Sequence, residues 1–267
     1  MRTQVMSKNV LLLDCFGIDS SIRVIALTGA GGKTSLMYAL AREISSRRQT
    51  VVTTTSTKIL PPTPNQSPRL LLFQDDPELK ELPEYLSRFC HVTVGRTVNS
   101  ASGKVEGVSD EVIAMCLEKA DKVILEADGA AGRPIKAPET WEPVIPHFTD
   151  LVIPIVGLDC IGKPASEEWV FRIEKFLTLT KLRKGGAITP ESIAKMLSDP
   201  NGGLKGAEAR ALVVPFLNKT DLLGDKAVVD VIVKRAFALT GRIKRVVAGR
   251  VKGKVEARSF VVGSGHF

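Results

Sequence analysis

The stretch VIALTGAGGKTSLMYALARE, residues 24–43, decides how this sequence is interpreted. It begins as a run of apolar and β-branched residues and then passes through a glycine-rich turn. An apolar stripe at helical spacing follows, formed by Leu36, Leu40 and Ile44. A glycine-rich turn between a strand and a helix is a setting in which backbone N–H groups and the helix N-terminus bind phosphate. The sequence therefore predicts a phosphate-binding loop.

The loop departs from the commonest phosphate-loop pattern. That pattern, G-x-x-x-x-G-K-S/T, asks for glycine where this chain has Leu27. The sequence T-G-A-G-G-K-T instead resembles the shortened loop of the Mur-type ligases, T-G-T-x-G-K-T/S. We expect the Lys33 ammonium to reach the outer phosphates and the Thr34 hydroxyl to bind Mg²⁺; the alternative is a plain strand–helix turn. The nucleotide-binding residues predicted here are Gly29, Ala30, Gly31, Gly32, Lys33, Thr34 and Ser35.

A second apolar run ends in carboxylates, in KVILEADGAAGRPIK (122–136). Phosphate-loop enzymes bind Mg²⁺ with a carboxylate at the end of a neighbouring strand. We expect Asp128 to bind Mg²⁺ and Glu126 to orient water or substrate, unless Glu126 only pairs with Lys122 or Arg133. Arg133 and Lys136 follow a loop that contains Gly129 and Gly132, and we expect both to contact a transferred phosphoryl group or an anionic substrate. The predicted catalytic residues are Lys33, Glu126, Asp128 and Arg133.

The segment VVPFLNKTDLL, residues 213–223, carries N-K-x-D directly after an apolar run. This arrangement resembles the guanine-recognition element of the GTPase superfamily, in which the aspartate accepts two hydrogen bonds that adenine cannot donate. We expect Asp221 to have that role, Asn218 to shape the pocket and the Lys219 stem to lie along the base. The alternative is an ordinary strand exit with Asp221 capping the next helix.

Two further segments follow predicted strands. The hydroxyls of TTTSTK (53–58) are placed to reach Mg²⁺ or a terminal phosphate, and Lys58 to meet an anion, although threonines are also common in edge strands. GLDCIGKP (157–164) follows another strand on the side where open sheets bind ligands, so we expect it to line the substrate cleft.

Apolar runs alternate with amphipathic stretches along the chain, and several runs are continuously apolar, as in strands covered by helices on both faces. This alternation predicts a three-layer, doubly wound α/β fold with a mostly parallel sheet of P-loop NTPase type. We expect one domain over residues 1–267, with 157–210 a mainly helical insertion. The predicted strands are 23–28, 50–55, 69–73, 91–95, 122–127, 151–156, 211–218 and 243–249, and predicted helices follow Gly32, Ser109, Thr189 and Gly224.

Composition narrows the class of protein. No apolar run reaches the roughly 18 residues of a membrane span, and Asp14 interrupts the apolar patch that follows Arg2 and Lys8. We therefore expect a cytoplasmic protein without a membrane partner. The four cysteines lie far apart, which predicts reduced, buried thiols. The three histidines (His91, His147 and His266) have no metal-ligand spacing, which argues against a transition-metal site.

The net charge of +8 and the pI of about 9.4 favour an anionic partner. Two Trp and two Tyr provide no aromatic ladder for stacking bases, so small phosphorylated ligands are favoured over nucleic acid. The basic segment 242–258 is interpreted either as a solvated basic edge or as a surface that binds an acidic macromolecule such as RNA.

Seven collinear stretches together resemble the YqeC family, described as accessory proteins of selenium-dependent hydroxylases. They are VIALTGAGGKTSLMYALA, VVTTTSTKI, ILEADGAAGRPIKAPETWEPVIP, IVGLDCIGKP, ITPESIAKML, GGLKG and FLNKTDLL. The resemblance implies a role in maturing selenium-containing molybdenum hydroxylases, with such a hydroxylase or its cofactor-maturation enzymes as partners. It implies no particular reaction.

The motifs and the resemblance together favour an accessory enzyme that hydrolyses a nucleoside triphosphate with Mg²⁺, GTP ahead of ATP. A Mur-like, ATP-dependent ligase or kinase acting on a small acceptor is the second hypothesis, since the loop has the shortened form. The third is a non-catalytic scaffold that binds a nucleotide or a pterin phosphate.

Overall fold

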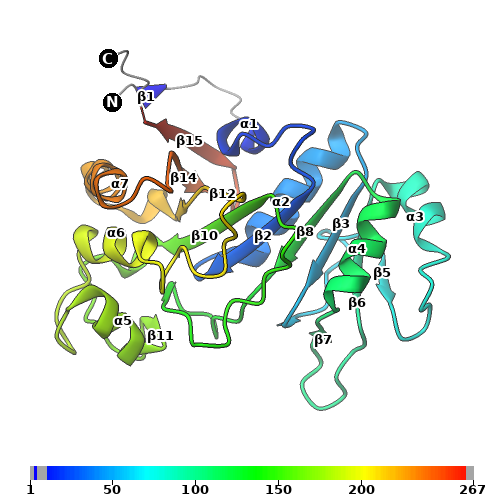
Figure 1. Ribbon diagram of the computed structural model, residues 1–267, viewed down its shortest axis with the longest axis horizontal. Coiled ribbons are helices and arrows are strands. Elements are labelled where there is room, and N and C mark those ends of the chain that lie inside the picture. The colour runs from blue at the N-terminus through cyan, green and yellow to red at the C-terminus, as the bar shows by residue number, and fades with distance from the viewer. Residues whose placement is uncertain (1–2, 5–10, 263–267) are drawn as a thin grey trace.

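A computed structural model describes residues 3–4 and 11–262, so Arg2, Lys8 and His266 lie outside the described residues. Its central element is one large sheet that runs through the molecule (Figure 1). The strands follow each other in the order β1 (Thr3–Gln4), β15 (Glu256–Val261), β14 (Arg245–Arg250), β13 (Phe216–Asn218), β10 (Leu151–Gly157), β2 (Val24–Gly29), β8 (Lys122–Glu126), β3 (Val51–Thr55), β6 (His91–Gly95) and β5 (Leu70–Leu72), with β12 (Leu212–Val213) beside β10.

The sheet is parallel from β14 to β5, and only β15 pairs antiparallel with its neighbours β14 and β1. Strand β2 lies in the interior, with β10 on one side and β8 on the other. After β2, the chain forms β3, β6 and β8 on one side of β2 and then β10, β13 and β14 on the other side. Ligands of open α/β sheets bind at the carboxyl end of such a switch point. The glycine loop lies there.

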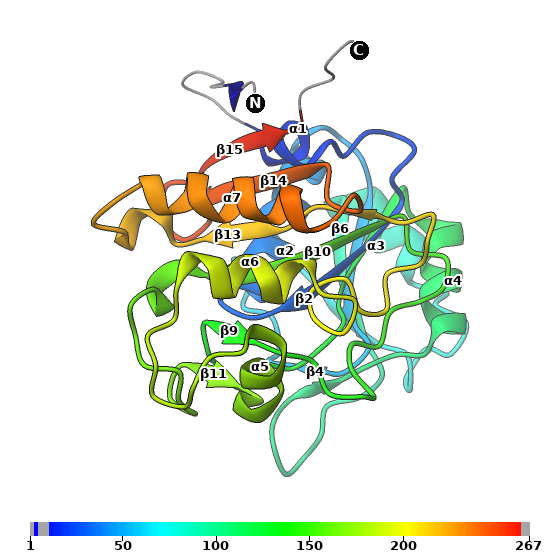
Figure 2. The ribbon, with the colours of Figure 1, turned by 60° about the vertical axis from the view of Figure 1, so that its left-hand side comes forward.

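Helices cover both faces of the sheet. Helices α1 (Leu12–Phe16) and α2 (Lys33–Ser46) pack on one face against alternate strand residues such as Ile25 and Leu27. The opposite face, which includes Val24 and Ala26, is covered near β8 by α3 (Leu82–Phe89) and α4 (Asp110–Lys119). Helices α6 (Pro190–Ser198) and α7 (Ala227–Leu239) lie side by side over the β10–β14 part (Figure 2). The predicted three-layer, mostly parallel α/β fold of P-loop NTPase type is confirmed.

The segment 157–210 carries the 3₁₀ turn η1 (Leu158–Cys160), β11 (Val170–Phe171), α5 (Ile173–Thr180) and α6. Its apolar residues share a core cluster with residues of β10, β13, β14 and α7, including Leu217 and Val246. Strand β11 pairs with β9 (Ile135–Lys136), and this pair lies next to α5 (Figure 2). The segment is thereby attached to the loop that follows β8.

Local sequence signals explain several element boundaries. Thr189 caps α6 through a reciprocal hydrogen-bonded box with Ser192, and Pro190 occupies the first turn, as predicted. Ser109 occupies the N-cap position of α4, but its side chain makes no capping hydrogen bond. The predicted strand 211–218 is divided into β12 and β13, because Pro215 has no N–H to donate to a ladder.

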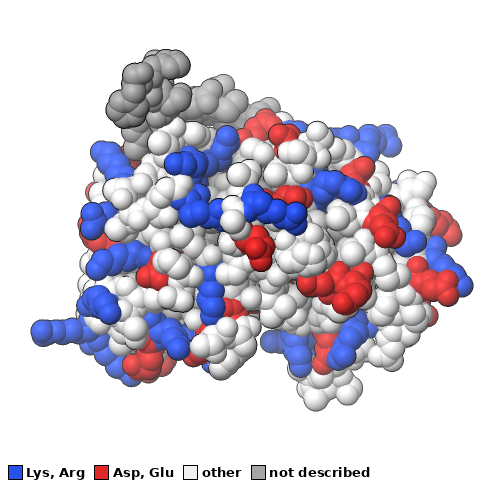
Figure 3. Space-filling model, in the orientation of Figure 1, with Lys and Arg blue, Asp and Glu red and all other residues white. Residues whose placement is uncertain are grey.

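Two predictions from composition also have structural counterparts. All four cysteines are free thiols; three are buried and Cys90 is partly exposed. None of the helices in residues 3–4 and 11–262 combines the length and apolar character that crossing a membrane requires. Basic and acidic side chains are interspersed on the face drawn in Figure 3.

A buried polar cluster lies under the α2 side of the sheet. The Nε2 atom of His91 is 3.0 Å from the Thr53 hydroxyl, which is 2.8 Å from the Thr93 hydroxyl. Burial lowers the pKa of His91 to about 4, because the charged imidazolium is poorly solvated there. The histidine is therefore neutral in the folded protein at pH 7.

His91 makes stability depend on pH. The unfolded chain binds a proton at His91 below about pH 6.5, whereas the folded chain does so only near pH 4, so stability falls as pH decreases through this window. The expected loss from His91 between pH 7 and pH 5 is about 2 kcal/mol. Urea unfolding of the wild type and His91→Gln at both pH values measures this, since the variant should lose correspondingly less stability on acidification. Equal pH dependence in both proteins would contradict the assignment.

Candidate functional site

The glycine loop joins β2 to α2 in a conformation that requires glycine. Gly29, Gly31 and Gly32 have φ values of +81°, +86° and +137°. These angles are strained for residues with a side chain. A Cβ atom on Gly31 would overlap the backbone of Gly157 and the Pro134 carbonyl. The backbone therefore lies close against two neighbouring segments, and its C-terminal end meets the start of α2.

Lys33 is buried at the first turn of α2 with three oxygen neighbours. Its ammonium donates to the Gly29 carbonyl at 2.6 Å and lies 3.1 Å from Asp128 Oδ1 and 3.7 Å from Glu126 Oε1. Burial on its own lowers the pKa of Lys33, but the two carboxylates outweigh it and the pKa is raised above its ordinary value. Lys33 is therefore charged and already paired with anionic oxygens at the site where phosphate is expected.

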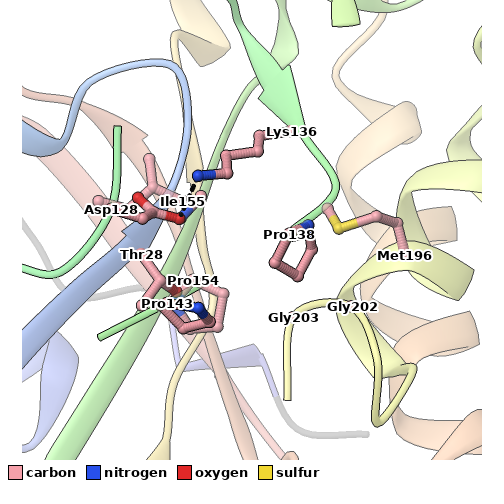
Figure 4. Close-up of a pocket in the computed structure, with 11 residues that line it drawn as sticks. Thr28, Asp128, Lys136, Pro138, Pro143, Pro154, Ile155, Met196, Gly202 and Gly203 are labelled. Atoms are coloured by element: carbon pink, nitrogen blue, oxygen red, sulfur yellow. Dashed lines mark hydrogen bonds and ion pairs between the residues drawn. The ribbon is translucent and has the colours of Figure 1, made fainter. Parts of the chain in front are cut away.

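Asp128 connects the glycine loop to the segment that follows β8. Its Oδ2 accepts a hydrogen bond from the Gly29 N–H at 3.0 Å and lies 3.2 Å from the Lys136 ammonium. Lys136 is fully buried and also lies 3.0 Å from Glu142 Oε2. Figure 4 shows the Asp128 and Lys136 side chains pointing toward each other. Asp128 thus lies between two buried ammonium groups, and Glu126 and Glu142 supply the further negative charge. The prediction that Lys136 contacts a phosphoryl group or an anionic substrate is wrong, because Lys136 is buried between two carboxylates.

Behind this pair lies a cavity of about 10 Å³, the size of about one water molecule. In Figure 4, Pro138, Met196 and Gly203 lie on the side of the cavity opposite Asp128. The cavity belongs to the packing of the 129–143 segment against α6. It has no room for a nucleotide.

Glu126, in contrast, faces the open side of the loop. Its Oε2 accepts a hydrogen bond from the Thr34 hydroxyl at 2.8 Å, and the residue lines the large cleft described below. Burial raises the pKa of Glu126, and the nearby Lys33 ammonium opposes this effect. The alternative in which Glu126 pairs with Lys122 or Arg133 does not occur, since Lys122 donates to the carbonyls of Asp19 and Ile22.

A cleft of about 820 Å³ lies over the carboxyl ends of the parallel strands. It brings together the glycine loop, the end of β8, the 129–133 loop, the NKTD segment, residues 58–60, Lys104 and residues 250–252. Its lining residues are Gly31, Gly32, Lys33, Thr34, Ser35, Lys58, Ile59, Leu60, Lys104, Glu126, Gly129, Ala130, Ala131, Gly132, Arg133, Asn218, Lys219, Asp221, Leu222, Arg250, Val251 and Lys252. Its size lies within the usual range for small-molecule sites.

The NKTD segment is held against the glycine loop. The Asn218 amide donates to the Gly31 carbonyl at 2.8 Å, which places the end of β13 beside the phosphate loop. The Lys219 ammonium donates to Asp159 Oδ2 at 2.6 Å, so the stem of Lys219 is fixed along the cleft wall. Asp221 lies in the 3₁₀ turn η2 (Thr220–Leu222) with a partly exposed side chain, 3.8 Å from Arg250 Nη1. It lines the cleft and caps no helix through a side-chain hydrogen bond.

Two parts of this arrangement were not predicted to lie beside the NKTD segment. Asp159, within the GLDCIGKP segment, contacts Lys219, although it does not line the cleft itself. Arg250 and Lys252 belong to the basic segment 242–258, for which a solvated edge and an acidic macromolecule were the two alternatives. Both line the cleft, and Arg250 lies 3.8 Å from Asp221. Only the pairing of β14 with β13 brings that stretch to the site, and no local motif marks it.

The remaining predicted residues occupy distinct positions. Arg133 lines the cleft, and its guanidinium donates to the carbonyls of Glu167 at 2.6 Å and Ala131 at 3.2 Å. Thr53, Thr54 and Thr55 are buried in hydrogen bonds within the sheet and do not line the cleft. Lys58 lines the cleft from the short strand β4 (Lys58–Ile59), which pairs with β7 (Val105–Glu106). Ala30 and Asp128 are buried outside it.

Comparison with known proteins agrees with the sequence resemblance. The family model described as YqeC protein matches residues 25–174. The chain belongs to the YqeC family. It is also 29% identical over 219 residues to the "Uncharacterized protein YqeC" of Escherichia coli (strain K12), covering 80% of this chain and 82% of that protein. The matched residues 25–174 include the glycine loop, Glu126, Asp128 and Arg133, whereas the NKTD segment lies beyond them.

The two carboxylates after β8 should differ in their effect on stability. Asp128→Asn leaves Lys33 and Lys136 buried without their shared counter-charge, which should cost about 3–5 kcal/mol. Glu126→Gln should cost clearly less, because burial already favours the neutral form of Glu126. Urea unfolding at pH 7 measures both free energies. Equal losses in the two variants would contradict the central position of Asp128.

Proposed function

We propose that this protein binds a nucleoside triphosphate with Mg²⁺ in the cleft over β2 and hydrolyses its terminal phosphoanhydride bond. The observation that carries the proposal is the first turn of α2. There, a loop of three glycines with positive φ, the Lys33 ammonium and the Thr34 hydroxyl meet at the carboxyl end of an interior parallel strand. Backbone amides at a helix N-terminus favour phosphate, and a lysine on the same turn adds a full positive charge.

The donor set at this turn fits Mg²⁺. Among the described residues no group of three or more His, Cys, Asp or Glu side chains is arranged around a metal position. Mg²⁺ bound with nucleotides needs fewer protein ligands, since phosphate oxygens and waters supply the rest. The Thr34 hydroxyl and the Glu126 carboxylate, 2.8 Å apart at the cleft, are such a pair. When bound, the ion would neutralise negative charge on the outer phosphates.

We therefore assign the metal-binding role to Glu126 together with Thr34. The sequence analysis gave this role to Asp128, but its carboxylate is enclosed by the Gly29 N–H and two ammonium groups and does not line the cleft. Asp128 instead positions Lys33 and the loop. Arg133 lines the cleft and precedes Pro134, whose carbonyl accepts from the Gly157 N–H beside the glycine loop, so it would contact the terminal phosphate or a second ligand.

The Lys33 side chain has the central role in phosphate binding. In the structure its three N–H groups face three oxygens, and phosphate oxygens would replace the more distant of these partners, Glu126 at 3.7 Å, first. That exchange would also release Glu126 for the metal. Phosphate binding and metal binding would therefore support each other at this turn.

The cellular role that fits the family resemblance is the maturation of selenium-dependent molybdenum hydroxylases. In that setting, nucleotide hydrolysis would reset a complex that delivers selenium or cofactor to its target, and the hydroxylase or its maturation enzymes would be the protein partners. The Mur-like ligase or kinase stays as the second candidate. It is favoured by the shortened loop and by the cleft volume of about 820 Å³, which leaves space for an acceptor.

Replacing Lys33 with methionine should abolish nucleotide binding. The change keeps most of the apolar stem but removes the charge that faces the phosphates, so the affinity for GTP or ATP with Mg²⁺ should fall at least about a hundredfold. Isothermal titration calorimetry measures the affinity. A thermal unfolding scan confirms that the variant is folded, and Lys80→Ala, an exposed change far from the cleft, is the matched control. Unchanged affinity in a folded Lys33→Met protein would refute the proposed function.

Asp221 tests the identity of the base. An aspartate accepts two hydrogen bonds from guanine, from N1–H and the 2-amino group. In Asp221→Asn the amide N–H donates instead, which suits the oxygen that xanthine carries at position 2. The variant should lose at least about tenfold in affinity for GTP and gain affinity for xanthosine triphosphate, while ATP binding stays unchanged. Competition of labelled GTP against each triphosphate measures this. An unaltered base preference would remove guanine recognition and leave the phosphate site intact.

A further inference from the structure

A second loop, residues 129–133 between β8 and β9, lies beside the glycine loop. Contacts to the glycine loop bracket it at both ends. Before it, Asp128 accepts from the Gly29 N–H, and after it, the Pro134 carbonyl lies 2.6 Å from where a Cβ atom on Gly31 would be. That carbonyl also accepts from an N–H at the end of β10. Because β2 lies between β8 and β10, the 129–133 loop passes across the carboxyl end of β2, and all five residues line the cleft.

The carbonyl groups of this loop are largely used within the protein. The Gly129 carbonyl accepts from the buried Lys136 ammonium at 2.6 Å. The Ala130 carbonyl accepts from the Arg133 N–H at 2.9 Å, and the Ala131 carbonyl accepts from Arg133 Nη1 at 3.2 Å. The loop sequence GAAGR contains no carboxylate. It therefore presents few acceptors to a ligand.

The donors of the loop are in the opposite state. Within the described part of the chain, the backbone N–H groups of residues 129–132 donate to no protein acceptor. The Arg133 guanidinium donates through Nε and Nη1, and its Nη2 has no hydrogen-bond partner among residues 3–4 and 11–262. A loop with occupied carbonyls, free N–H groups and a cation suits a ligand that carries many acceptor oxygens and negative charge.

We propose that the 129–133 loop is the second half of the phosphate site, so that the phosphate chain of the nucleotide lies between this loop and the glycine loop. The N–H groups of residues 129–132 and the Arg133 guanidinium would donate to phosphate oxygens that Lys33 and the glycine loop leave free. Lys136 holds the start of the loop through the Gly129 carbonyl. The inference rests on the proposed nucleotide site and assigns its second set of phosphate contacts.

The test compares two ligands, because the loop should contact phosphate and not the base. A non-hydrolysable GTP or ATP analogue and inorganic tripolyphosphate, each with Mg²⁺, are titrated into the full-length protein by calorimetry. The first variant is Gly132→Val. At a φ of +74° a β-branched residue is strongly disfavoured, while a Cβ there meets no atom within 4 Å, so the change displaces the loop without a clash. Gly185→Val is the matched control, with a φ of +79° and equally free space off the cleft.

A second variant removes the charge and leaves the backbone unchanged. Arg133→Gln lacks the guanidinium, and Arg235→Gln, an exposed change on α7 off the cleft, is its control. Gly132→Val and Arg133→Gln should each bind both ligands at least about tenfold more weakly than the wild type, by a similar factor for the two ligands. Both controls should bind them as the wild type does.

The outcomes separate this inference from the proposed function. Wild-type affinity for both ligands in Gly132→Val and Arg133→Gln, with folding checked by a thermal scan, overturns the role of the loop and leaves the proposed function standing. A loss confined to the nucleotide, with tripolyphosphate binding unchanged, overturns it too, because the contact would then be to the nucleoside. Equal weakening in the controls has the same meaning. A wild type that binds neither ligand refutes the proposed function instead.

Discussion

The site depends on one buried carboxylate that faces two buried ammonium groups. Asp128 has Lys33 on one oxygen and Lys136 on the other, and the Gly29 N–H adds a third contact. Burial of these two lysines requires nearby negative charge, which Asp128 supplies to both and Glu126 and Glu142 supplement, because the desolvation of each ion costs several kcal/mol. The contacts also fix position. They connect the start of the glycine loop with the segment after β8. The Lys136–Glu142 pair extends this connection to the residues that precede β10.

The same arrangement explains why the loop approaches its neighbours so closely. Gly31 lies against the backbone of Gly157 and Pro134, so the loop is confined between the end of β10 and the segment that Lys136 anchors. Asn218 confines it from a third side through the Gly31 carbonyl. A phosphate site whose N–H groups are held in advance by three segments loses little conformational freedom on binding. The glycine-rich sequence is therefore compatible with a rigid loop.

Much of the fold could be predicted from sequence because its strands are continuously apolar and its glycine loop has a specific setting. The parallel α/β architecture follows from that alternation, and the structure confirms it. Helix α1 and strand β15 were not predicted, since α1 is only one turn long and β15 pairs at the sheet edge with mixed polarity. Such short or half-exposed elements carry weak periodicity. They are defined by tertiary contacts rather than by local pattern.

The site shows the same division between local and tertiary information. The glycine loop and the NKTD segment each have a local sequence motif, and both line one cleft in the structure. The roles of Glu126 and Asp128 could not be separated from sequence, because alternation along an extended strand gives both carboxylates the same face. The separation arises only where β8 ends, since Ala127 and Asp128 leave the strand and Asp128 turns toward two lysines.

The position of Asn218 has a consequence for how the two halves of the nucleotide would be recognised. Its amide joins the base end of the cleft to the phosphate loop through one hydrogen bond, and Lys219 is joined to Asp159 beside it. A shift of the phosphate loop would therefore be transmitted to the turn that carries Asp221, because residues 218–221 are contiguous. In the proposed function, Lys33 would exchange its Glu126 contact for phosphate at the other end of that loop. In the proposed nucleotide site, base and phosphate recognition would thus be linked through Gly29 to Gly32, three of which are glycines with positive φ.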